Sequence, residues 1–290
     1  MTVLKAILLT LFLILVFALT QVGFGLLVYK TELIPESYQT HYGITIGLSF
    51  IIGYLVTFKI FWKSNFGIKK SLKLKKIDFR LIPYLILIVV GLQLLDRPFW
   101  DLERIWNFLN YSEFQTDISS FSGFRPALLY NTISILIIAP IFEELFFRKF
   151  LLQNLLKKNS KIIGILISSL CFAIIHIETL LNLVPTFIFG IISGLIFIKT
   201  KRIIYSIILH FLVNLMVQTL YVFDFTFDRW LLTLDFNFIY WVMFLIGIGI
   251  TYFATKKLLA TTVAVAQLNQ EVAIRQTLKE APTTQLIVMV

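Results

Sequence analysis

Long apolar stretches constrain the fold of this chain more than any other feature. Eight of them approach the roughly 20 residues that a helix needs to cross the hydrocarbon core of a bilayer. They cover residues 4–29, 41–62, 79–95, 127–156, 161–179, 183–199, 203–223 and 236–255. The composition agrees: 14% of the residues are charged, whereas a soluble domain carries about 25%. The sequence therefore predicts an all-α, polytopic membrane bundle of about eight transmembrane helices.

The distribution of Lys and Arg predicts how these helices are oriented. In the eight-helix interpretation, most of the 26 basic residues fall on one side of the membrane. The other side holds only Lys30, Arg97, Arg104, Arg125 and Arg229. Because basic loops stay in the cytoplasm, both termini are predicted to be cytoplasmic, in a multi-pass protein of the cell membrane. The net charge of +10 therefore indicates a bilayer as partner and no nucleic acid.

Composition divides the chain into three predicted parts. Residues 1–126 hold the first three apolar stretches, a basic cytoplasmic loop and an outer loop that begins at Asp96. Residues 127–256 are the predicted functional core, and residues 257–290 are a short cytoplasmic helix and tail. The basic loop 63–80 is either ordinary cytoplasmic loop charge or a segment that lies on anionic headgroups.

Two adjacent carboxylates in the stretch "PIFEELFFRKF" (140–150) are unexpected in an apolar environment. A charge at the centre of a membrane helix costs about 2.5–3.5 kcal/mol, and ionisable residues at such depth usually serve a function. Glu143 precedes the turn near Asn159 by 16 residues, and His176 follows that turn by 17. At 1.5 Å per residue, both lie roughly 24–26 Å from the turn. Antiparallel helices would therefore bring them to one level.

The seventh stretch adds two polar residues at a comparable depth. His210 and Asn214 lie about 14 and 20 Å along the helix from the turn near Lys201. They are separated by four residues and share a helix face. The sequence thus predicts that four polar side chains from three helices converge.

The two glutamates are expected to differ in role. Glu144 and Arg148 are four residues apart, so they can pair and brace the helix. Glu143 points about 100° away from Glu144, toward no evident cation, and is the better acid or base. Pro140 is expected to free the Leu136 carbonyl and to kink the helix before Glu143. The alternative is purely structural, since a lone intramembrane histidine often hydrogen-bonds a neighbouring helix.

Three motifs in this region resemble a known family. The segment "EELFFR" (143–148) matches E-E-x-x-x-R, "FAIIH" (172–176) matches F-x-x-x-H, and "HFLVN" (210–214) matches H-x-x-x-N. In this order, on separate apolar stretches, they resemble the CPBP family of intramembrane proteases, also called the CAAX-protease, bacteriocin-processing or abortive-infection family. The resemblance covers about residues 125–223.

The resemblance implies a role for each matching residue. Glu143 would activate the attacking water with help from His176, and His210 and Asn214 would form the oxyanion hole. Glu144 and Arg148 would support the site, and Phe172 would pack against it or line it.

The resemblance leaves the cofactor and the substrate class open. The zinc spacing His-Glu-x-x-His is absent, so metal-independent activation of water is expected. Glu143, His176 and His210 remain the candidate ligands if a divalent ion binds. The implied partner is a membrane-embedded or lipidated protein, or a peptide precursor. The alternative is a non-catalytic membrane scaffold or bacteriocin-immunity protein that binds a membrane partner. An ion-coupled transporter is less favoured because no second acidic site or inverted repeat is visible.

Overall fold

The computed structural model describes residues 1–31, 38–62, 77–102, 105–106, 109, 132–176, 182–223, 230, 233–234 and 236–280. Every regular element in these ranges is helical, as predicted. The longer helices are α1 (Val3–Thr31), α2 (Tyr38–Phe61), α4 (Ile82–Trp100), α9 (Lys161–Ile174), α10 (Leu183–Thr200), α11 (Ile203–Phe223) and α13 (Phe238–Glu280). The shorter elements are η2 (Phe79–Leu81), η3 (Ser134–Ile138), α7 (Ala139–Glu144), η4 (Leu145–Leu152) and α8 (Gln153–Leu155).

Four of the described helices are long and apolar enough to cross a membrane. They cover Val3–Leu27, Phe79–Trp100, Leu183–Thr200 and Phe238–Thr262. Three shorter apolar helices cover Thr45–Phe61, Lys161–Ile174 and Ile203–Thr219. These seven segments fall on seven of the eight predicted stretches, and the eighth stretch, 127–156, contains η3, α7, η4 and α8.

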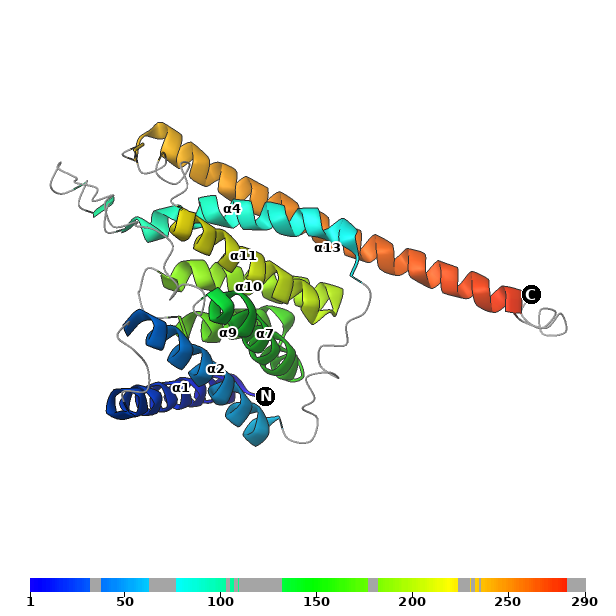
Figure 1. The fold of residues 1–290 in the computed structure, drawn as a ribbon. Coiled ribbons are helices and arrows are strands. Elements are labelled where there is room, and N and C mark those ends of the chain that lie inside the picture. Colours follow the sequence, from blue (N-terminus) through cyan, green and yellow to red (C-terminus); the bar gives the residue numbers. More distant parts are fainter. Residues whose placement is uncertain are drawn as a thin grey trace.

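The helices form three groups in the bundle (Figure 1). Helices α1 and α2 pack against each other on one side, and α4 packs along α13 on the opposite side. Helices α9, α10, α11 and the segment with α7 lie between these two pairs. The C-terminal part of α13 continues well past the N-terminal end of α4 (Figure 1). The core between the groups is mostly aliphatic but includes several large buried aromatic side chains, among them Tyr54, Phe58, Phe146, Phe147 and Phe172.

Helices α4 and α13 approach each other closely because glycines meet at their crossing. A Cβ atom added at Gly91 would lie 2.8 Å from the backbone nitrogen of Thr251. One added at Gly247 would lie 2.6 Å from the backbone nitrogen of Leu95. Such distances to backbone atoms require the helices to separate. Small residues of this kind are the usual means by which membrane helices come into close contact.

Gly247→Ala is therefore expected to lower the melting temperature in detergent, with an overpacking cost of about 1–3 kcal/mol. The matched control is Gly249→Ala on the same helix, where an added Cβ would contact nothing within 4 Å. That control gains helix propensity, roughly 1 kcal/mol, so its melting temperature should be equal or higher. Equal melting temperatures for the two variants would show that the crossing tolerates an additional methyl group.

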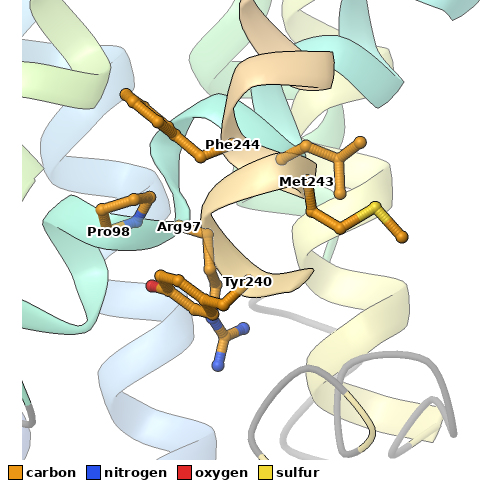
Figure 2. A pocket seen from close by; sticks show the side chains of 6 residues that line it. Arg97, Pro98, Tyr240, Met243 and Phe244 are labelled. Carbon is orange, nitrogen blue, oxygen red and sulfur yellow. The ribbon is translucent and has the colours of Figure 1, made fainter. Parts of the chain in front are cut away.

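The third predicted helix is longer than expected. The sequence predicted its end at residue 95, before a charged outer loop, but α4 continues to Trp100. The pairing of Arg97 with Asp101 stabilises its last turn. Arg97 Nε donates to Asp101 Oδ2 at 2.8 Å, and the Tyr240 hydroxyl of α13 donates to the same oxygen at 2.9 Å. Figure 2 shows Arg97 and Pro98 of α4 beside Tyr240, Met243 and Phe244 of α13. These contacts with the first residues of α13 stabilise α4 beyond Asp96 and Arg97.

The C-terminal segment also differs from the prediction. The sequence predicted a separate short helix after residue 257, but α13 runs from Phe238 to Glu280 as one element. Lys256 lies over the ring of Tyr252 at 5.7 Å, and Lys257 over that of Phe253 at 5.5 Å. Lysine and aromatic side chains gathered in this way are typical of the place where a helix crosses the membrane interface.

Candidate active site

The site is built on a helical segment with π-type hydrogen bonding. The Ala139 N–H donates to the carbonyl of Ser134, five residues earlier. A second π-helical segment, η4, carries Arg148. Wide turns of this kind are rare and are frequently found at functional sites. Glu143 and Glu144 lie on the α-helical segment α7 between the two π-helical segments, and as adjacent helical residues they point in different directions.

Glu143 is the acidic group at the cavity. Its side chain is 2% exposed, and its Oε2 atom has no hydrogen-bond partner among the described residues. This oxygen lies 3.5 Å from His176 Nε2 and 3.9 Å from His210 Nε2. Glu143 and His176 line a cavity of about 330 Å³. The structure thus brings together the three residues that the depth argument placed at one level.

His176 is held in a defined tautomer. Its Nδ1 lies 2.9 Å from the carbonyl oxygen of Phe172, one helical turn earlier. Because a carbonyl only accepts, Nδ1 carries the hydrogen, and the lone pair of the neutral ring is on Nε2. That lone pair faces Glu143. Two acceptor atoms, His176 Nε2 and Glu143 Oε2, therefore face each other at 3.5 Å. A single donor group could hydrogen-bond to both.

Glu144 and Arg148 form the core of a buried ionic network. Both side chains are fully buried, with Arg148 Nε 3.1 Å from Glu144 Oε2. The Ser193 hydroxyl of α10 donates to the same carboxylate oxygen at 2.8 Å and accepts from Arg148 Nε at 3.1 Å. Ser168 of α9 accepts from Arg148 Nη1 at 3.4 Å. The network links three helices. That it braces the fold stays a prediction.

His210 connects this network to Glu143. Its Nδ1 lies 3.1 Å from Glu144 Oε1. An ionised carboxylate only accepts, so Nδ1 carries a hydrogen in this pair. The other ring nitrogen faces Glu143 Oε2. A carboxylate that orients a histidine is a common way to fix the ring for proton transfer.

Asn214 lies next to the site but makes a contact that the sequence did not predict. Its Nδ2 donates to the Ile135 carbonyl at 2.8 Å. In the five-residue hydrogen-bond pattern of η3, residue 140 would donate to residue 135, but Pro140 has no N–H. Pro140 therefore leaves the Ile135 carbonyl without this bond, and Asn214 satisfies it; the release of the Leu136 carbonyl stays a prediction. One Nδ2 hydrogen remains for another acceptor.

Aromatic rings pack the site from one side. The Phe172 ring lies 4.6 Å from the His176 ring and 5.6 Å from the His210 ring, measured between centroids. The guanidinium carbon of Arg148 lies 5.0 Å from the centre of the same ring. Phe189 packs against His210 at 4.9 Å. The Phe172 ring therefore packs against both histidines; its role in the site stays a prediction.

In the part of the chain that the structure describes, no group of three or more His, Cys, Asp or Glu side chains is arranged to hold a metal ion. Among the candidate ligands Glu143, His176 and His210, the two Nε2 atoms lie 3.5 and 3.9 Å from one Glu143 oxygen, and His210 Nδ1 is engaged with Glu144. Metal-independent activation of water stays a prediction.

Comparison with known proteins identifies the segment that carries these residues. Residues 125–216 match the sequence model of a family described as type II CAAX prenyl endopeptidase, Rce1-like. A search of curated proteins finds no match. All three motifs, 143–148, 172–176 and 210–214, lie inside the matched segment, whereas α1 and α2 lie outside it. This segment, residues 125–216, is therefore similar to the CAAX-type protease family, of which CPBP is another name.

Proposed function

We propose that this protein is an intramembrane endopeptidase that hydrolyses a peptide bond of a membrane-associated or lipidated substrate. The observation that carries the proposal is the Glu143 carboxylate. Its Oε2 atom is buried and without a hydrogen-bond partner among the described residues, 3.5 Å from His176 Nε2, at the wall of a cavity. A water molecule between these two acceptors would donate one hydrogen to each and leave an oxygen lone pair for attack.

The proposed reaction begins with this water. As its oxygen attacks the substrate carbonyl carbon, Glu143 takes one of its protons. The carbonyl oxygen becomes an oxyanion, which His210 would stabilise in its doubly protonated, cationic form: Nε2–H donates to the oxyanion while Nδ1–H keeps the bond to Glu144. The remaining Nδ2 hydrogen of Asn214 is a second candidate donor. When the intermediate collapses, the carbon–nitrogen bond breaks and the proton held by Glu143 passes to the leaving amine.

The membrane location supports this choice of substrate. The similarity of residues 125–216 to a family of CAAX-type endopeptidases and the four long apolar helices support a membrane protein. The candidate site lies on helices packed inside the bundle, and the cavity is lined by Ile14, Phe17, Ile46, Phe50 and Ile175 besides its polar groups. Such a lining favours substrates that bring apolar side chains or a lipid chain with them.

The experiment uses the purified full-length protein in lipid nanodiscs and a panel of fluorescence-quenched peptides. The panel contains a peptide that ends in a prenylated C-a-a-X sequence, the same peptide without its lipid, and an apolar precursor-like peptide. Cleavage of at least one peptide, with the new ends identified by mass spectrometry and lost in Glu143→Gln, is the expected result. Full biological activity of a folded Glu143→Gln protein would instead indicate a scaffold that acts by binding.

We propose eight membrane spans with both termini in the cytoplasm. The basic loops support this orientation. The apolar part of α13 ends at Thr262, and the contacts of Lys256 and Lys257 with aromatic rings near this point support a membrane interface there. A green fluorescent protein fused after Glu280, the end of α13, is expected to fluoresce, and a periplasmic reporter fused there is expected to be inactive. The opposite pattern would reverse the orientation or change the number of spans by one.

A further inference from the structure

The cavity at Glu143 has a second wall, and helices outside the family-matched segment provide it. Helix α1 contributes Ile14, Phe17, Ala18 and Gln21, which follow the spacing of one helix face. Helix α2 contributes Ile46, Ser49 and Phe50, again from one face. The Phe17 and Phe50 rings contact each other edge to face at 5.1 Å. The wall is therefore apolar except for two polar side chains.

These two side chains belong to a hydrogen-bonded cluster of Gln21, Thr45 and Ser49. Gln21 Nε2 donates to Thr45 Oγ1 at 3.2 Å, and Ser49 Oγ donates to Gln21 Oε1 at 3.0 Å. Thr45 and Ser49 are 6% and 3% exposed, so the cluster is mostly shielded from solvent. The two bonds fix the Gln21 carboxamide from both ends, which pre-organises it in one orientation.

The fixed carboxamide retains hydrogen-bonding capacity. A glutamine side chain has two N–H donors and two oxygen lone pairs, and these two bonds use one of each. One donor and one acceptor remain on a residue that lines the cavity. A peptide group offers the complementary pair, a C=O and an N–H. In an apolar cavity such a pair is costly to leave unpaired, so a bound peptide that satisfies it gains affinity.

The size and charge of the cavity further restrict the kind of ligand that it can bind. A volume of about 330 Å³ is at the lower end of the range for ligand pockets, enough for a short extended segment. The described lining residues include the acid Glu143 and no lysine or arginine. An acidic substrate side chain would therefore enter without a counter-charge, which disfavours it.

We propose that Gln21, held by Thr45 and Ser49, binds the backbone of an extended, apolar substrate segment beside the scissile bond. The substrate backbone donates one N–H to Gln21 Oε1 and accepts one hydrogen from Gln21 Nε2. Its apolar side chain packs against Phe17 and Phe50. This inference rests on the proposed function, and it makes α1 and α2 the helices that select the substrate.

The test compares kcat and KM of the wild-type protein and Gln21→Leu on the cleaved peptide of the panel. Leucine keeps the approximate shape and removes both hydrogen bonds, so KM is expected to rise about three- to tenfold while kcat stays within about twofold. The matched control is Thr20→Val. The Thr20 hydroxyl bonds only carbonyls of its own helix, at Val16 and Phe17, so that variant should keep the wild-type KM.

Substrates with one backbone amide replaced by an ester make the test specific for a backbone contact. The ester removes a single N–H. At one position beside the scissile bond it should raise the wild-type KM several-fold, and it should raise the Gln21→Leu KM no further. Equal sensitivity of both proteins at every position, or an unchanged KM in Gln21→Leu, would overturn the proposal. A fall in kcat alone would identify Gln21 as a brace between helices.

A binding measurement separates this inference from the proposed hydrolysis. The fluorescent prenylated peptide is titrated into Glu143→Gln and into the double variant Glu143→Gln/Gln21→Leu, neither of which needs to turn over. A Kd raised about three- to tenfold in the double variant supports substrate binding by Gln21, even if the wild-type protein cleaves no peptide. Identical Kd values, or no binding by either variant, would reject substrate binding by Gln21, whether or not the protein proves to be a protease.

Discussion

Replacing Arg148 by alanine is expected to give the largest loss of stability of any substitution in the site. Arg148 and Glu144 are both fully buried and lie 3.1 Å apart. Without the guanidinium, the Glu144 carboxylate would remain in the bundle with Ser193 and His210 as partners but without its cation. Removing one member of a buried ion pair typically costs about 3–5 kcal/mol. The melting temperature in detergent and the yield of folded protein should both fall sharply.

Two further variants test whether the lost charge is the cause. Lys149→Ala removes a positive charge from the neighbouring position of η4 and should leave the melting temperature nearly unchanged. The double variant Glu144→Gln/Arg148→Met removes both buried charges and should recover part of the stability that Arg148→Ala loses. If Arg148→Ala melts at the wild-type temperature, the network is not a brace, and the assignment of Arg148 to structural support is wrong.

Apolar length predicted the helices well but not all of their ends. Helix α11 covers the residues of its predicted stretch, Ile203–Phe223, because Lys201 and Arg202 interrupt the apolar sequence before it. The end of α4 was predicted too early because a charge count treats Arg97 as a loop residue. In the structure, Asp101 pairs with Arg97, and the Tyr240 hydroxyl donates to Asp101. The Tyr240–Asp101 bond joins residues that are 139 positions apart, so local sequence does not predict it.

The site was predictable where helix depth decides the contacts. Equal distances from a turn brought Glu143 and His176 together, because antiparallel helices fix depth almost independently of packing detail. The π-helical segments were not predictable from the motif, and they moved the contact of Asn214 to Ile135. Ser168 and Ser193 were missed as well. A serine in an apolar helix is common, and only the packing of α9 and α10 against Arg148 distinguishes these two.

The second wall of the cavity was missed for a related reason. Gln21 is a single polar residue in a long apolar helix, and sequence alone cannot tell whether it faces lipid, another helix or a cavity. Its partners Thr45 and Ser49 lie on α2, at spacings set by how α1 crosses α2. The family resemblance did not help, because it begins near residue 125.

Glu143→Gln is expected to abolish turnover and leave the fold intact. The replacement is nearly isosteric and removes a buried carboxylate oxygen that has no described hydrogen-bond partner. The new amide can direct an N–H toward the lone pair on His176 Nε2, which lies 3.5 Å from Glu143 Oε2. The melting temperature should therefore equal or exceed that of the wild type. An amide cannot take a proton from water, so the rate should fall by at least the 10²–10⁴-fold that a general base contributes.

The matched control for this prediction is Glu144→Gln, the same chemical change one residue along. There the carboxylate is paired with Arg148, Ser193 and His210, so neutralising it leaves the buried guanidinium without its counter-charge. Glu144→Gln should therefore lower the melting temperature, and Glu143→Gln should not. Thermal unfolding and peptide cleavage, measured on both variants in the same nanodiscs, distinguish the two residues. If Glu143→Gln destabilises the protein and Glu144→Gln only slows cleavage, the catalytic and structural roles of the two glutamates are reversed.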